Sequence, residues 1–285
     1  MSTPVDNPPA IINLRPEDED ALEQALEILE CPGLAARLSH QLGVPIEQGF
    51  SRLPANWQHR VQQLSEQALR KAIDVAVASL SIEQLQQTTP SEKTHRWLAA
   101  GSGGLGGLFG FSALALELPV STTIMLRSIA DIARRQGEEI RNLDTRLACL
   151  EVFALGGISS QDEGSGSGYY IVRAALSRAV VDASRYLAQR TITQTGAPPL
   201  VQLIAAISTR FGAVVSQKAA AQMVPLVGAA GGAVVNVIFM DHFQNMARGH
   251  FVIRRLERAY GKEYIQQRYQ QLLTHREDAL GQSRQ

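Results

Sequence analysis

Residues 97–134 read WLAAGSGGLGGLFGFSALALELPVSTTIMLRSIADIAR, and their pattern indicates the fold class most directly. No residue in 97–116 is charged, and six glycines lie inside that run. After Pro119, large aliphatic side chains recur at the three- and four-residue spacing of a buried helix face. A second uncharged run, residues 219–240, is also rich in glycine and alanine. Small side chains let helix backbones approach closely, so both runs predict closely packed helices.

The rest of the chain shows the same helical periodicity. In residues 54–81, apolar side chains beginning at Val61 occupy one helix face and polar side chains the other. No alternating pattern typical of strands and no repeat of fixed period is present. Further helices are predicted at 16–30, 34–42, 144–155, 169–188 and 200–216, from the second uncharged run to about residue 260, and around 265–273.

These patterns predict an all-α protein with a single compact multi-helix domain. Its two central helices would be the uncharged runs rich in glycine and alanine. The domain is expected at residues 16–275, after a disordered N-terminal arm at 1–15 and before a frayed C-terminal tail at 276–285.

The composition narrows the functional class. The 285 residues carry a formal net charge of +0, which lacks the basic surplus of a nucleic-acid-binding protein, so we expect no nucleic-acid partner. Cys31 and Cys149 are far apart and lack metal-ligand spacing, which predicts a reducing compartment. The N-terminus is polar and rich in proline, so no secretory signal is expected and a cytoplasmic location follows.

Motifs for cofactors and metals are weak. Gly101-x-Gly103-x-x-Gly106 matches the letters of a dinucleotide-binding fingerprint, but it follows a predicted helix where the fingerprint needs a strand. His242 and His250 lie eight residues apart, which is not the spacing of a helical zinc site. We therefore expect no cofactor and no metal.

Acidic residues inside apolar helices are the catalytic candidates. Glu117 ends the first uncharged run; it is either a solvated helix junction or a buried carboxylate at a site. Asp131 and Asp241 lie in aliphatic helices, and His242 is a candidate acid–base partner. Asp131 is also spaced to pair with Arg127, which is the structural alternative. A hydrolase or lipid-handling enzyme would need these groups within about 10 Å of one another. A small-ligand or lipid carrier, the third alternative, would need a cavity between helices lined by the two glycine-rich runs.

Membrane or ligand contact is the other candidate role. For the glycines, the alternative to such contact is helix packing alone. For the arginines of residues 248–262, the alternative is a solvated helix face on which they pair with Glu257 and Glu263. Those arginines would otherwise bind anionic lipid. The contact candidates are Gly103, Gly107, Gly110, Pro119, Gly228, Gly232, Arg254 and Arg255.

Three stretches resemble the EcsC protein family. They are FSALALELPVSTTIMLRSIADIAR at 111–134, LEVFALGG at 150–157, and the segment 224–261, which contains VPLVGAAGGAVVN and MDHFQNMARGHFVIRRLERAYG. The resemblance covers about residues 50–270 and implies a helical, glycine-rich, rather hydrophobic domain of a bacterial protein. The family's namesake is encoded beside an ABC-transporter pair in Bacillus-type bacteria. The resemblance carries no catalytic residues onto this chain.

The sequence therefore favours a membrane-associated helical protein, not an enzyme, that is an accessory to transport or envelope functions at the inner face of the cell membrane. The expected partners are a membrane lipid surface or a membrane protein, with self-association through the glycine-rich faces as a further option. Whether the uncharged runs enter a bilayer or form a packed core stays open.

Overall fold

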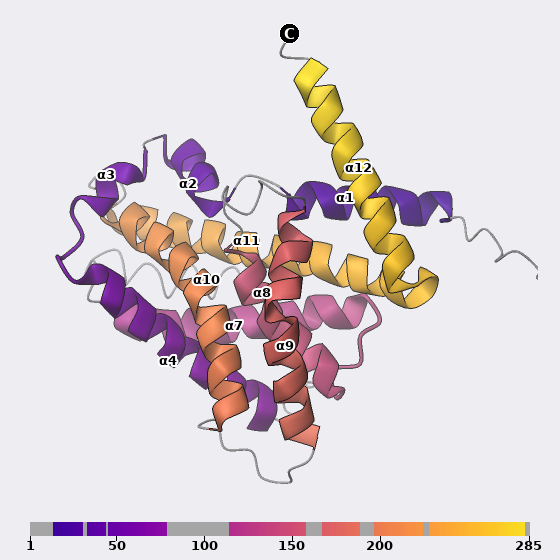
Figure 1. The fold of residues 1–285 in the computed structure, drawn as a ribbon. Helices are drawn as coiled ribbons and strands as arrows, with labels where there is room; N and C mark the ends of the chain where they lie inside the picture. Colours follow the sequence, from indigo (N-terminus) through magenta and orange to yellow (C-terminus); the bar gives the residue numbers. More distant parts are fainter. Residues whose placement is uncertain are drawn as a thin grey trace, which may run out of the picture.

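The computed structural model of the chain is a helical bundle, and the all-α prediction is confirmed (Figure 1). The structure describes residues 14–30, 33–43, 45–78, 114–157, 167–188, 197–224 and 228–282. The helices of this part of the chain are α1 (Pro16–Leu29), α2 (Leu34–Leu42), α3 (Glu47–Phe50), α4 (Trp57–Ala78), α7 (Leu114–Arg135), α8 (Leu143–Leu155), α9 (Gly168–Ala188), α10 (Pro198–Gln222), α11 (Gly228–Tyr260) and α12 (Lys262–Gln282).

Local sequence signals set several of the helix ends. Pro16 occupies the first position of α1, where a missing N–H costs nothing, and acidic residues fill the first turn. Gly43 ends α2 in the left-handed conformation, with φ of 67°. Asn142 caps α8, because its side-chain oxygen accepts the Asp144 backbone N–H at 3.0 Å.

The 33-residue helix α11 lies at the centre and packs against α1, α2, α7, α8, α10 and α12. Helices α7 and α11 run side by side in the same direction (Figure 1). The hydrogen bond from Gln244 to Ser128 joins the two helices, and the ion pair of Arg254 with Glu138 joins α11 to the connection that follows α7.

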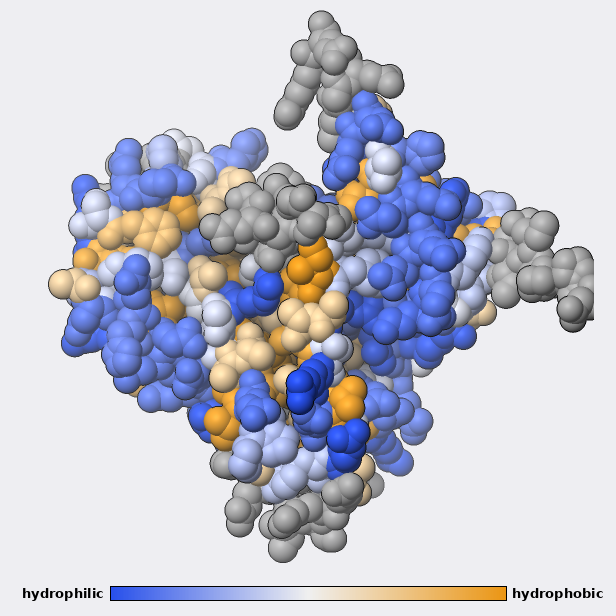
Figure 2. All heavy atoms as spheres, viewed as in Figure 1, coloured by the Kyte–Doolittle hydropathy of each residue, from blue (hydrophilic) through white to orange (hydrophobic). Residues whose placement is uncertain are grey.

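Aromatic rings fill the junction of α8, α10 and α11. Phe153 meets Phe211 at a centroid distance of 5.2 Å, and Phe243 meets Phe239 at 5.2 Å, both edge to face. Such edge contacts add to the hydrophobic gain from burying the rings. On the face shown in Figure 2, apolar side chains gather at the centre, over α8, α9 and α10, whereas the surface of α12 is hydrophilic.

The structure divides the second uncharged run between two helices. The first residues of the run form the end of α10, which continues to Gln222 and not only to the expected Ser216. The helix α11 begins at Gly228. Pro225 follows α10 in the sequence, and proline disfavours helix at the residue before it. Of the first run, 97–113 lie outside the described residues, together with the candidates Gly103, Gly107 and Gly110; α7 contains only the last three residues, 114–116.

The last helix also departs from expectation. Helix α12 continues to Gln282, into the segment 276–285 that the sequence predicted as frayed. Residues 276–280 contain neither glycine nor proline, so the helix continues although the side chains of 276–279 are exposed.

A close approach of backbones joins α3 to α10. A methyl group added at Gly49 would lie 1.8 Å from the carbonyl oxygen of Ala220, which is part of a helix backbone and cannot move aside cheaply. We predict that Gly49→Ala destabilises the protein by about 3 kcal/mol, as overpacking does. Urea unfolding followed by circular dichroism measures the change.

Gly212→Ala is the matched control for this prediction. A methyl group there would first meet Oε1 of Gln62, at 3.0 Å, and this atom ends a flexible side chain. The expected change is smaller than about 1 kcal/mol, because alanine also has the better helix propensity. Equal destabilisation by the two variants would contradict the importance of the α3–α10 approach.

Candidate functional site

Three helical segments that meet at one end of the bundle contain only two charged residues. The segments are 114–126 of α7, 211–224 at the end of α10 and 228–240 of α11, and the charged residues are Glu117 and Lys218. We call these three segments together the uncharged end. Lys218 of α10 contacts Glu117 of α7 and the Phe239 ring of α11, so the three segments meet at this point.

The two charged residues pair with each other out of contact with solvent. The ammonium group of Lys218 donates to Glu117 Oε1, and the amide of Gln222 donates to Glu117 Oε2 at 3.3 Å. The Lys218 and Glu117 side chains are 0% and 3% exposed. The Lys218 nitrogen also lies 4.6 Å from the centre of the Phe239 ring, a favourable cation–π position. Burial lowers the pKa of Lys218, and the neighbouring Glu117 carboxylate partly offsets that effect.

Apolar side chains project from the same end. Leu116 is 81% exposed, Val120 is 47% exposed and Val234 is 45% exposed. Among the described residues, Val181 of α9 is the one other large hydrophobic side chain with comparable exposure. Three of the four lie on the α7 and α11 segments of the uncharged end. Exposed apolar patches of this kind mark binding surfaces.

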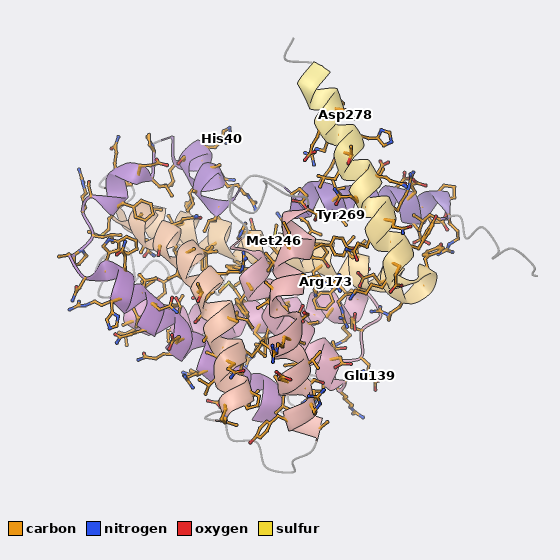
Figure 3. The ribbon with its side chains drawn as sticks, in the orientation of Figure 1. His40, Glu139, Arg173, Met246, Tyr269 and Asp278 are labelled. Atoms are coloured by element: carbon orange, nitrogen blue, oxygen red, sulfur yellow. The ribbon has the colours of Figure 1, made fainter. Side chains whose placement is uncertain are left out.

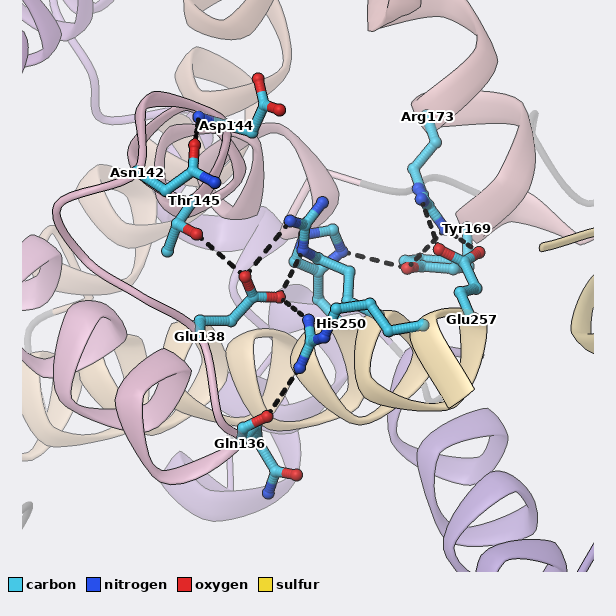
Figure 4. A network of polar contacts seen from close by, with 11 residues as sticks. Gln136, Glu138, Asn142, Asp144, Thr145, Tyr169, Arg173, His250 and Glu257 are labelled. Atoms are coloured by element: carbon cyan, nitrogen blue, oxygen red, sulfur yellow. Dashed lines mark hydrogen bonds and ion pairs between the residues drawn. The ribbon is translucent and has the colours of Figure 1, made fainter. Parts of the chain in front are cut away.

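A second polar cluster lies in the interior between α9 and the C-terminal half of α11 (Figure 4). The Tyr169 hydroxyl and His250 Nδ1 share a hydrogen bond of 3.0 Å, and Arg173 donates to the Tyr169 oxygen at 3.1 Å. Arg173 also forms a two-pronged ion pair with Glu257, with distances of 2.7 and 3.0 Å. Burial raises the pKa of Tyr169 and lowers that of His250. His250 is 0% exposed, whereas the Arg173 and Glu257 side chains are 15% and 10% exposed, so the inner part of the cluster is closed to solvent.

The same cluster reaches the C-terminal helix. The Tyr269 ring of α12 packs edge to face against Tyr170, with centroids 5.2 Å apart, and its hydroxyl donates to Glu30 at 2.9 Å. Figure 3 labels Arg173 and Tyr269, which lie where α9, α11 and α12 meet. The cluster therefore acts as a structural junction of α1, α9, α11 and α12.

Arg254 and Arg255, the predicted lipid-binding arginines, take part in ion pairs within the protein. Arg254 donates to Glu138 at 2.8 Å and Arg255 donates to Asp18 at 2.7 Å. Burial alone would raise the pKa of Glu138, but the hydrogen bonds and charge of Arg254 lower it overall. The partners differ from the predicted Glu257 and Glu263. These arginines attach α11 to α1 and to the α7–α8 connection.

The four catalytic candidates do not converge. Asp131 follows Glu117 by 14 residues on the continuous helix α7, which separates them by about 21 Å along the axis. Asp131 pairs with Arg134 at 3.5 Å. The buried His242 donates from Nε2 to the Gly156 carbonyl at 2.8 Å, and Asp241 beside it is half-buried. The structure therefore does not form one pocket from the four side chains.

The remaining contact candidates lie within the helices. Pro119 is half-buried in α7, where its carbonyl accepts the Thr123 hydroxyl at 2.8 Å, and Gly232 is buried in α11. Gly228 is the first residue of α11. In the described part of the chain, no three His, Cys, Asp or Glu side chains gather as metal ligands would. One hollow of about 370 Å³, between α1 and α12, is lined mainly by polar residues, among them Glu19 and Arg268.

Within the described residues, α10 is the one helix long and apolar enough to cross a bilayer, with a mean hydropathy of 1.4 in its most apolar window. Half of that window is buried inside the bundle. The core helix of a bundle passes the same test, so length and hydropathy do not distinguish the two roles for α10.

Comparison with known proteins identifies the family. The model of the EcsC protein family matches residues 33–256, which is most of the chain. The chain belongs to the EcsC protein family. No curated protein and no solved structure matches it. The EcsC match includes the uncharged end and His250, whereas α1 and α12 lie outside it.

Sequence reasoning missed several residues of this EcsC protein. The most important is Lys218, which precedes the second uncharged run as Glu117 follows the first. Two lone opposite charges beside uncharged runs were a usable signal for a buried pair. Nothing local indicated that Tyr169, Arg173 or Glu138 would join α11, because their partners are 81 to 116 residues away.

We predict that Lys218→Met destabilises the protein by about 4 kcal/mol, because it leaves the buried Glu117 carboxylate without its partner. The double variant Glu117→Leu/Lys218→Met should recover most of this loss, since apolar side chains replace buried ion pairs well. Urea unfolding measures both. The control is Arg185→Met, whose ion pair with Asp182 is exposed and contributes less than about 1 kcal/mol. A double variant as unstable as the single one would contradict the pairing.

We also predict a loss of stability in mild acid. Burial lowers the pKa of His242 to about 4, whereas an unfolded chain has a histidine pKa of about 6.5. The unfolded chain therefore binds more protons in this interval, so stability is complete above about pH 6.5 and falls by about 3 kcal/mol towards pH 4. His250, whose pKa is also lowered, contributes in the same direction.

Urea unfolding between pH 7.5 and pH 4.5 tests this pH dependence. His242→Gln keeps an amide donor for the Gly156 carbonyl but cannot titrate, so its stability should depend less on pH. An equally steep dependence in this variant would show that His242 is not responsible.

Proposed function

We propose that this EcsC-family protein binds membrane surfaces, and that the uncharged end is its contact with the bilayer. The observation that carries the proposal is the exposure of Leu116, Val120 and Val234 on segments whose two charged residues are buried against each other. Such a surface is poorly matched to water and well matched to the outer hydrocarbon of a bilayer.

The charge distribution supports an apolar contact over an electrostatic one. Insertion of an unpaired charge into a bilayer is expensive, and these three segments expose none. The alternative surface, around Arg254 and Arg255, has its cations paired with Glu138 and Asp18. Paired cations attract anionic lipid less than free ones do.

The expected binding is peripheral and reversible. Full burial of a leucine or valine side chain contributes about 1.5–3 kcal/mol, and three such side chains offer a modest total. On this basis the protein lies on the membrane, at the inner face of the cell membrane, and does not depend on a span. An accessory role in transport or envelope functions would use the bundle as a docking unit beside a membrane protein.

Flotation with vesicles tests the proposal, using the full chain and phosphatidylcholine vesicles. The wild type should float, and flotation should survive 500 mM salt, because apolar insertion is not screened. Leu116→Asp/Val120→Asp should reduce the bound fraction at least ten-fold, since it places two carboxylates at the contact. Val181→Asp is the matched control, because Val181 is 51% exposed on α9, which packs on α8 and α10.

Val181→Asp should bind as the wild type does. A wild-type protein that floats with no vesicle of any composition would refute membrane binding. Equal losses from the α7 double variant and from Val181→Asp would refute the uncharged end as its location.

A further inference from the structure

The turn that joins α3 to α4 borders the uncharged end. Gly49 of α3 approaches Ala220, a residue of the uncharged end, so closely that an added methyl group would lie 1.8 Å from the Ala220 oxygen. Phe50 follows Gly49, and its ring centre lies 5.5 Å from that of Trp57, the first residue of α4. Because α3 packs on α10 at this point, residues 50–60 lie beside the uncharged end, and we call them the α3–α4 corner (Figure 1).

The α3–α4 corner carries two arginines that no carboxylate neutralises within the described part of the chain. Arg52 and Arg60 are both exposed, and neither side chain takes part in an ion pair or hydrogen bond with another described residue. Glu47 is the one acidic residue between Pro45 and Val61, so two arginines stand against one carboxylate and the net charge there is +1. The paired arginines of α11 differ in this respect, since their charges are compensated within the protein.

The aromatic pair gives the corner a second property of surfaces that meet a bilayer. Phe50 and Trp57 are half-buried, with part of each ring against the core and the rest at the surface. Tryptophan is enriched at the level of the lipid head groups, because its ring is apolar and its N–H is polar. Leu53 is buried, which anchors the turn between the two rings while the adjacent Arg52 stays exposed.

We infer that the α3–α4 corner binds the head groups of anionic phospholipid, with Arg52 and Arg60 at the phosphates and Trp57 at the boundary with the hydrocarbon. The inference rests on the proposed function and names its lipid class. The uncharged end supplies the apolar part of the binding, and the corner adds a preference for negative charge. A guanidinium group suits this role because it stays protonated and donates two parallel hydrogen bonds to phosphate.

The size of the preference can be stated in advance. One net positive charge near an anionic membrane surface strengthens binding about five-fold. The full-length protein should therefore bind vesicles containing 30% phosphatidylglycerol about five-fold better than phosphatidylcholine vesicles at 50 mM salt. At 500 mM salt the preference should disappear, because exposed charges are screened, whereas apolar binding to both vesicles should persist.

Substitutions at exposed positions separate the charges without disturbing the core. Arg52→Gln/Arg60→Gln should lose the preference for anionic vesicles and bind phosphatidylcholine as the wild type does. Glu47→Gln removes the opposing carboxylate, so its preference should rise by a further factor of about five. The matched control is Arg178→Gln/Arg276→Gln, which makes the same change in net charge at exposed positions of α9 and α12 and should keep the wild-type preference. Circular dichroism verifies that each variant is folded.

Tryptophan fluorescence tests the placement of the corner independently of charge. The chain has two tryptophans, so Trp97→Phe leaves Trp57 as the sole emitter. With anionic vesicles, its emission should move to shorter wavelength and brominated phospholipid should quench it. Emission that bound vesicles neither shift nor quench would overturn the placement of Trp57 at the membrane.

The outcomes distinguish this inference from the proposed function. A wild type that binds neither vesicle refutes the proposed function. Equal binding to both vesicles at 50 mM salt leaves membrane binding in place and overturns the inference, as does a preference that survives in Arg52→Gln/Arg60→Gln. Inorganic phosphate at matched ionic strength should leave the preference unchanged. Its loss would mean that the corner binds free phosphate and would overturn the assignment to lipid.

Discussion

The hydrogen bonds and ion pairs made by the last turns of α11 fix the positions of the helices around it. Side chains on this part of the helix project in several directions, and most of the polar ones bond to an element other than α11. His250 and Glu257 bind α9, Arg254 binds the α7–α8 connection, and Arg255 binds α1. Because several of these groups are buried, removal of one partner leaves the other uncompensated and destabilises the fold.

The first part of the same helix, in contrast, contains no ion pairs. From Gly228 to Met240 it has no charged residue, and Val235, Ile238, Phe239 and Met240 are buried in the apolar core. A single continuous helix thus joins a half fixed by ion pairs to a half that carries none.

The sequence predicted what is local and missed what is distant. The bounds of α2 and the end of α11 near residue 260 agree with the ranges predicted from helical periodicity. Gly43 and Gly261, which follow these two helices, take positive φ. The partners of Arg254, Arg255 and Lys218 did not follow, since they lie 116, 237 and 101 residues away and no helical spacing encodes them. Glu117 was singled out from its position, but its buried environment required knowledge of Lys218. The convergence of Glu117 with Asp131 was wrong for a simpler reason, which is the length of helix between them.

The docking of α1 onto α11 sets an order of events during synthesis. Asp18 emerges from the ribosome 237 residues before Arg255, its partner. At about 5–20 residues per second, α1 waits on the order of 10–50 s with its stripe of Leu22, Leu26 and Leu29 uncovered. The N-terminal helix is therefore synthesised first and docks among the last. Until α11 is complete, the leucine stripe of the nascent chain is accessible to chaperones.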